Sequence, residues 1–248
     1  MKVLFHEKFY ERYTQDPAAA PGRLEAVMKV IEPHVELVEA EPADPEDIRA
    51  VHTESHIEWV RGEGLYEISA LAAGGAVQAA VLGMQEPCFG LIRPPGHHAS
   101  PDSAWGFCFF SNMAIAMCHL LRTGRVKSGH VLDFDMHFGD GTVNALLSTP
   151  EVTIHNPSTP DRKAYLREVE ARLNECRADV IGISAGFDDH VEDWGGTLLT
   201  SDFTQMGRLV RERAKELGAG CFAILEGGYN HEVLGHNALA LIQGLGGA

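Results

Sequence analysis

Short apolar runs alternate with longer amphipathic segments along almost the whole chain. Runs rich in β-branched and aromatic residues, bounded by glycine, proline or charged residues, predict β-strands. These strands are expected at 2–5, 88–92, 131–134, 152–154, 180–184 and 221–225. Between them, apolar residues spaced by three and four positions predict helices. The helices are expected at 23–33, 69–82, 112–122, 161–176, 203–217 and 233–245, with two short ones near 44–52 and 53–59.

Most of the predicted strands are apolar on both faces and alternate with helices. Strands of this kind are typical of a parallel sheet that is covered by helices on each side. We therefore expect an α/β fold with a mainly parallel β-sheet. A chain of 248 residues suits one large domain spanning 1–248, and two small domains are the weaker alternative.

The net charge limits the kinds of binding partner that we expect, and the cysteines indicate the cellular compartment. Lys and Arg number 20 against 35 Asp and Glu, a net charge of −15, which disfavours nucleic acid and anionic membranes and is compatible with a cationic substrate. The five cysteines form no Cys-x-x-Cys pair, so we expect no disulfide framework and a cytoplasmic protein. The apolar stretch 1–5 is too short for a signal peptide, and no run approaches membrane-spanning length.

Four ionisable side chains gather where the predicted strand 131–134 ends: Asp133, Asp135, His137 and Asp140. A buried carboxylate without a partner is costly, so such a cluster needs a cation or mutual pairing. Asp135 and His137 are two positions apart and would project from the same face of an extended chain. They would supply two of the three protein ligands of an open zinc site. The alternative is an ordinary polar surface turn without a metal.

Three further loops follow predicted strands and carry candidates for a third metal ligand, for proton transfer and for stabilising an oxyanion. Asp188 follows the strand 180–184 and is a candidate third ligand; the resulting set of two oxygens and one nitrogen suits zinc, and ferrous iron could also occupy it. His97 and His98 could act as general base and general acid. Tyr229, on a Gly-Gly turn, could donate its hydroxyl to a developing oxyanion.

Asp133 and Asp140 could each accept the second ring N–H of one of these histidines. Each of the residues also has an ordinary structural interpretation: turn histidines, a loop aromatic, a helix cap. Their joint position at the ends of four predicted parallel strands favours a single site.

Five segments, in order, resemble the motifs of the zinc-dependent deacetylase family, which contains histone deacetylases, acetylpolyamine amidohydrolases and acetoin-utilisation proteins. The resemblance covers most of the chain and is densest over 90–144 and 180–230. It implies the arginase-type α/β fold. The segments are Arg93-Pro-Pro-Gly-His-His-Ala99, Gly106-Phe-Cys108, Asp133-Phe-Asp-Met-His-Phe-Gly-Asp-Gly141, Ala185-Gly-Phe-Asp188 and Glu226-Gly-Gly-Tyr229.

The resemblance also implies metal sites. Asp135, His137 and Asp188 would bind zinc. A structural potassium ion would lie near Asp133, held largely by backbone carbonyl groups.

The same resemblance implies the catalytic roles. His98 would be the general base and His97 its electrostatic partner. Asp133 would pair with His97, and Asp140 with His98. Tyr229 would clamp the substrate carbonyl and stabilise the oxyanion.

The channel for the acyl group would use other positions. Phe107 would form one wall, and Gly106 would let the substrate stem pass. Arg23 resembles the arginine that lines the inner pocket from which acetate leaves. Phe138 replaces a histidine found in many family members, a change that spares the ligand positions.

Two loops depart from the family pattern. The segment 156–164 is short, whereas the family usually carries a longer loop there that supplies a second aromatic wall. We therefore expect a more open mouth, or a mouth that a second subunit completes as a homo-oligomer. The segment 61–65 is also short, which leaves Glu63 as a weak candidate for the rim acid, and Gly195 offers no acidic gate. His155 and His190 fall near the presumed catalytic edge.

The function that we expect is a zinc-dependent amidohydrolase that removes an acetyl or other short acyl group from an amine, such as acetyl-lysine or an acetylated polyamine. One alternative is a deacylase of a small acylated metabolite amide. Another is a catalytically idle metal-binding homologue. The expected partner is the acylated amine substrate, with neither nucleic acid nor membrane.

Overall fold

A single parallel β-sheet forms the centre of the protein. The computed structural model describes residues 1–247, and every neighbouring pair of strands in its seven-stranded sheet is parallel. The strand order is β2-β1-β3-β7-β6-β4-β5. The strands are β1 (Lys2–Phe5), β2 (Glu36–Glu39), β3 (Cys88–Gly90), β4 (Gly129–Asp133), β5 (Val152–His155), β6 (Val180–Ala185) and β7 (Gly220–Leu225).

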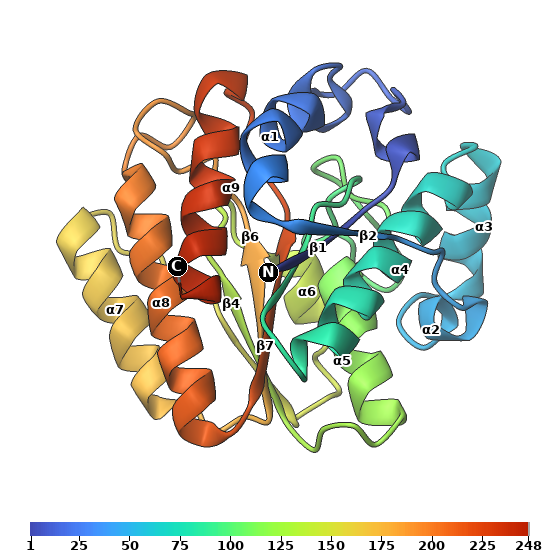
Figure 1. The fold of residues 1–248 in the computed structure, drawn as a ribbon. Coiled ribbons are helices and arrows are strands. Elements are labelled where there is room, and N and C mark those ends of the chain that lie inside the picture. Colours follow the sequence, from blue (N-terminus) through green and yellow to red (C-terminus); the bar gives the residue numbers. More distant parts are fainter. Residues whose placement is uncertain (248) are drawn as a thin grey trace.

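Helices cover both faces of the sheet (Figure 1). One layer holds α7, α8 and α9, with α1 against α9, and the other holds α4 and α5 with the shorter helices α2, α3 and α6 around them. The predicted fold class, an α/β fold with a mainly parallel sheet and helices on both faces, is thereby confirmed. The helices are α1 (Arg23–Ile31), α2 (Pro45–Arg49), α3 (Glu54–Gly62), α4 (Tyr66–Gly83), α5 (Asn112–Arg122), α6 (Asp140–Ala145), α7 (Arg162–Glu175), α8 (Thr200–Leu217) and α9 (His231–Gly246).

The sequence-based boundaries are close to the observed ones, but the strand β2 and the short helix α6 were not predicted. Strand β2 pairs with β1 at the edge of the sheet, and three of its four residues are exposed, so it lacks the apolar run that identifies the other strands. Two short helices begin at capping side chains. The Asp44 carboxylate accepts the Glu46 N–H at 2.8 Å, and the Thr53 hydroxyl accepts the His56 N–H at 3.4 Å.

Four neighbouring strands end at the same edge of the sheet. They are β3, β7, β6 and β4, which lie side by side in the strand order. Ligands of open α/β sheets bind outside the carboxyl ends of the strands. The segments that follow these four strands carry the residues that the sequence singled out.

Candidate active site

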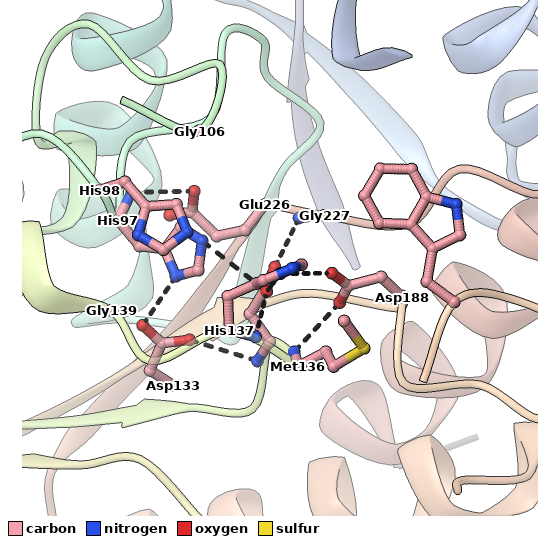
Figure 2. A network of polar contacts seen from close by, with 12 residues as sticks. His97, His98, Gly106, Asp133, Met136, His137, Gly139, Asp188, Glu226 and Gly227 are labelled. Atoms are coloured by element: carbon pink, nitrogen blue, oxygen red, sulfur yellow. Dashed lines mark hydrogen bonds and ion pairs between the residues drawn. The ribbon is translucent and has the colours of Figure 1, made fainter. Parts of the chain in front are cut away.

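The three predicted metal ligands converge. Asp135, His137 and Asp188 offer ligand atoms that all lie within 4.8 Å of one another, the one such group that residues 1–247 form. The Nδ1 atom of His137 lies 3.1 Å from Asp135 Oδ1 and 3.0 Å from Asp188 Oδ2, and Figure 2 shows the imidazole facing the Asp188 carboxylate. Ligand atoms around a tetrahedral zinc ion lie about 3.4 Å apart, since each bond is about 2.1 Å long. The cluster therefore has about the size that such an ion requires.

A turn, and not an extended strand, brings the first two of these side chains together. Strand β4 ends at Asp133, and the chain then folds so that the His137 N–H donates to Asp135 Oδ1 at 2.9 Å. The expectation that the two side chains share one face of a strand was wrong in its geometry. An aspartate carboxylate can capture the backbone N–H two residues ahead, which stabilises a turn at this position.

Backbone N–H groups fix the other carboxylate oxygens. Gly227 donates to Asp135 Oδ2 at 2.9 Å, and Met136 donates to Asp188 Oδ1 at 3.1 Å. A Cβ atom at position 227 would lie 2.5 Å from Asp135 Oδ2, so only glycine lets the backbone approach this closely.

The charge balance of this cluster favours a bound cation. Asp188 Oδ2 is buried, and the partner that the structure gives it is the His137 imidazole, which also lies against Asp135. Burial, followed by repulsion from the Asp135 carboxylate, raises the pKa of Asp188 to about 6. Two buried carboxylates that repel each other and share one imidazole fit a divalent cation, which would neutralise both.

The two adjacent histidines each pair with the aspartate that the family resemblance indicated. His97 Nδ1 lies 3.2 Å from Asp133 Oδ2, and His98 Nδ1 donates to Asp140 Oδ1 at 2.7 Å. The two rings lie against each other with centroids 4.0 Å apart. Their catalytic roles stay predictions.

The two imidazoles differ in charge. Burial opposes protonation of His97, but the carboxylates of Asp135 and Asp133 outweigh it and raise the pKa of His97 well above its ordinary value. Burial and the neighbouring His97 charge lower the pKa of His98 to about 4, against the opposing effect of Asp140. His97 is therefore the charged member of the pair at neutral pH, and His98 is the neutral one.

Glu226 holds the turn that presents the histidines, a role that the sequence did not suggest. Its Oε2 atom accepts the N–H groups of Gly96 at 2.7 Å and His97 at 3.2 Å. The glutamate is fully buried, and burial raises its pKa to about 7. Its position in the Glu-Gly-Gly-Tyr segment was the available signal, because a glutamate directly after an apolar strand needs a partner.

Tyr229 is held from several sides. Asp193 Oδ2 accepts the Tyr229 N–H at 2.8 Å. Trp194 stacks on the phenol ring with centroids 4.0 Å apart, and Phe107 meets the same ring edge-on at 6.0 Å. The Arg23 guanidinium lies 5.4 Å from the ring centroid. Burial raises the pKa of Tyr229, so the phenol keeps its proton and can donate a hydrogen bond.

Arg23 lies behind this tyrosine. It is fully buried and donates to the carbonyl oxygens of Gly228 at 2.8 Å and Glu226 at 2.7 Å. This position is compatible with the inner pocket that the family resemblance implies for it.

A cavity of about 50 Å³ opens among these groups. Two of the side chains around it were not assigned from the sequence, Trp105 and Trp194, which are 55% and 52% exposed. They supply aromatic surface at the mouth, where the short segment 156–164 left a wall unassigned. Its lining includes His98, Trp105, Gly106, Phe107, Trp194 and Tyr229.

Several other candidates lie outside this cavity. His155 Nε2 is 3.4 Å from Glu168 Oε1, and His190 Nε2 is 3.2 Å from the Thr200 hydroxyl. Glu63 lines a separate surface pocket with Lys8 and other residues. Within the described chain none of these three lines the cavity.

Fold and site together define an α/β protein with a cluster of three candidate metal ligands beside two aspartate-paired histidines and a tyrosine. A model of the histone deacetylase domain matches residues 18–165 and 159–245. The chain belongs to the histone deacetylase family, which confirms the resemblance found in the sequence.

Individual relatives agree with this assignment. The chain is 31% identical to a probable deacetylase of Methanothermobacter thermautotrophicus, over 99% of this chain and 91% of the relative. It is 28% identical to a histone deacetylase-like amidohydrolase of Pseudomonas aeruginosa, over 95% of this chain and 80% of the relative. The crystal structure of the HDA15 HD domain has the same fold, with a TM-score of 0.86 at 22% identity, over 99% of this chain and 89% of that one.

Proposed function

We propose that this protein is a metal-dependent deacetylase that removes an acetyl or other short acyl group from an amine. The observation that carries the proposal is the convergence of Asp135, His137 and Asp188 beside the histidine pair and Tyr229. Relatives with the names deacetylase and amidohydrolase support the reaction type. We propose zinc as the metal, with ferrous iron as the alternative that the same ligand set admits, and a structural potassium ion near Asp133.

A divalent cation, when bound, would polarise the amide carbonyl and lower the pKa of a water molecule. His98 is the group that accepts the proton of that water, because its ring is neutral and its Nδ1 is held by Asp140. This leaves Nε2 available to the cavity.

The remaining steps use the other side chains of the site. Tyr229 donates its hydroxyl proton in a hydrogen bond to the carbonyl oxygen as negative charge develops there. His97, held by Asp133, supplies positive charge beside His98. The amine then leaves with a proton from the protonated histidine.

Assays with acetyl-lysine peptides and acetylated polyamines test the proposal. We expect hydrolysis that a chelator abolishes and that zinc restores. Tyr229→Phe should lower kcat by about 10²- to 10³-fold, because it removes one oxyanion donor. Full turnover in Asp135→Ala or His137→Ala protein would contradict the proposal.

A small acylated metabolite amide is the second candidate substrate. The observation that favours it concerns Glu63, the candidate for an acidic residue that would bind a peptide backbone at the rim. Among the described residues, Glu63 lines a separate surface pocket and not this cavity, so no residue is assigned to that role. Comparing kcat/KM for acetylated free amines and for acetyl-lysine peptides separates the two. Binding of zinc without hydrolysis of any acyl amide would instead indicate an idle homologue.

The compartment and the partners belong to the same proposal. The five cysteines are thiols in this structure, which supports a reducing cytoplasm. No helix within residues 1–247 has the length and apolar character needed to cross a membrane. We propose the acylated amine as the partner, without nucleic acid or membrane, and keep the second subunit at the mouth as a hypothesis that sedimentation of the purified protein would test.

A further inference from the structure

Trp105 contacts both members of the His98–Asp140 pair. Its indole ring stacks on the His98 imidazole, with centroids 3.8 Å apart and an interplanar angle of 30°. Its Nε1–H donates to Asp140 Oδ2 at 2.9 Å. The other oxygen of the same carboxylate accepts the His98 Nδ1–H at 2.7 Å. The three side chains therefore close a ring of contacts in which each touches the other two.

The backbone after Trp105 is built to follow the imidazole closely. Gly106 has a φ of +58°, and Phe107, a non-glycine residue, has a φ of 69°. A Cβ atom at position 106 would lie 2.4 Å from the Cδ2 atom of His98. Glycine adopts this conformation freely, whereas a non-glycine residue such as Phe107 keeps it only where surrounding contacts hold it, and such residues cluster at functional sites.

The two side chains that Trp105 contacts differ in their exposure to solvent. The His98 side chain is 3% exposed, whereas Asp140 is 36% exposed. A carboxylate open to water can rotate and exchange partners, which would release the imidazole it holds. The Trp105 N–H engages the oxygen that His98 does not use, and the indole face covers the ring that would otherwise meet solvent.

We infer that Trp105 is a positioning residue for His98, acting through Asp140. The inference rests on the proposed function, in which His98 accepts a proton. Trp105 fixes the carboxylate, the carboxylate fixes the Nδ1 side of the imidazole, and Nε2 is thereby held toward the cavity. The indole face also stabilises the positive charge that His98 acquires during the reaction.

Two substitutions of Trp105 separate its hydrogen bond from its stacking. Trp105→Phe keeps an aromatic face and loses the N–H, so kcat should fall about tenfold while KM changes less than about threefold. Trp105→Ala loses both contacts, and kcat should fall by roughly 50-fold. Trp59→Phe is the matched control, because Trp59 lies against His56, 5.3 Å between centroids, outside the cavity, and it should leave kcat unchanged.

The double variant Trp105→Phe/Asp140→Asn tests whether the tryptophan acts through the carboxylate. Removing the N–H should cost nothing further once Asp140 is an amide, so the double variant should match Asp140→Asn alone. A further tenfold loss, or wild-type kcat in Trp105→Phe and Trp105→Ala, would overturn the inference.

A measurement independent of turnover uses the Nδ1–H proton of His98 in protein labelled with ¹⁵N-histidine, assigned by its loss in His98→Gln. Its exchange with water should be slow in the wild type, faster in Trp105→Phe and fastest in Trp105→Ala, with Trp59→Phe unchanged. Equal exchange in all four proteins would refute the positioning role. If wild-type protein hydrolyses no acyl amide, the proposed function fails while this measurement still decides the role of Trp105.

Discussion

Two histidine pairs in this protein are buried to the same degree but have different hydrogen-bond partners. His97 and His98 lie at the carboxyl edge of the sheet with ring centroids 4.0 Å apart. His52 and His56 lie at α3, stacked at 4.9 Å. All four residues are 3% exposed. Burial and ring contact are therefore shared, and neither explains why one pair lies in the candidate active site.

The partners of the rings make the difference. His52 Nε2 accepts the backbone N–H of Ser111 at 2.9 Å, and His56 Nε2 donates to the Phe109 carbonyl oxygen at 2.7 Å. No carboxylate within residues 1–247 forms an ion pair with either ring. Burial, aided by electrostatic repulsion from His56, accordingly lowers the pKa of His52 to about 3. We expect a histidine pair without carboxylates to have a structural role, whereas aspartate partners would let the other pair hold and transfer a proton.

Deleting one ring from each pair should give the largest contrast. His98→Ala should lower kcat by about 10²- to 10⁴-fold, the range for a general base. His56→Ala should leave kcat per folded molecule close to wild type and lower the free energy of unfolding by about 1–3 kcal/mol, because a buried carbonyl loses its donor. Kinetics and urea unfolding of both variants check this. Equal loss of kcat in the two variants would erase the distinction between the pairs.

Removing one carboxylate should make the catalytic pair resemble the structural one. Asp133→Asn leaves a side chain of the same size beside His97 but no negative charge, so kcat should fall by about 10- to 100-fold. KM should change little, because the aspartate lies behind the ring. Asp47→Asn serves as the control, since Asp47 also contacts a histidine, His119, at 3.0 Å, away from the cavity. A larger loss of kcat in the control would show that carboxylate pairing alone does not define the site.

The lowered pKa of His52 should make the free energy of unfolding depend on pH. His52 has an ordinary pKa of 6.5 and a folded pKa of about 3, so between these values the unfolded chain binds a proton that the folded protein excludes. Its contribution to stability is therefore complete above pH 6.5 and is lost as the pH falls toward 3.

The slope from this group approaches about 1.4 kcal/mol per pH unit at most. His52→Gln keeps an acceptor for Ser111 and should make the free energy of unfolding fall less steeply from pH 6.5 to 4, as measured by urea unfolding. An unchanged slope in the variant would contradict the assignment of His52 as a buried neutral imidazole.

The sequence predicted the sheet and the reactive groups for a physical reason. Asp135 and His137 follow a strand whose apolar residues leave ionisable groups no ordinary structural use, so their place in one cluster could be predicted without coordinates. Strand β2 was missed because an exposed edge strand carries no apolar run. Burial and stacking of His52 on His56 depend on the tertiary packing of α3, which no local spacing encodes.

The two tryptophans at the mouth were missed for a related reason. Trp105 stacks on His98 directly before Gly106 and Phe107, which both adopt left-handed conformations. Trp194 reaches Tyr229 because Asp193 accepts the Tyr229 N–H from the neighbouring loop. The contacts of Trp105 with Asp140 and of Trp194 with Tyr229 each join residues 35 positions apart in the chain, and an isolated tryptophan in a loop carries no signal of its partner.

The smallest expected effect concerns Trp194, whose indole ring stacks on Tyr229 and, within residues 1–247, donates no side-chain hydrogen bond to a carboxylate. Trp194→Phe preserves an aromatic face against the phenol, so kcat should change by less than about threefold; a stacking pair contributes about 0.5–1.5 kcal/mol, and the phenylalanine keeps most of it. Trp105→Phe, which loses a hydrogen bond to a carboxylate, should cost more under the same assay. If Trp194→Phe proved the more damaging of the two, orientation of the tyrosine, and not of the histidine pair, would limit turnover.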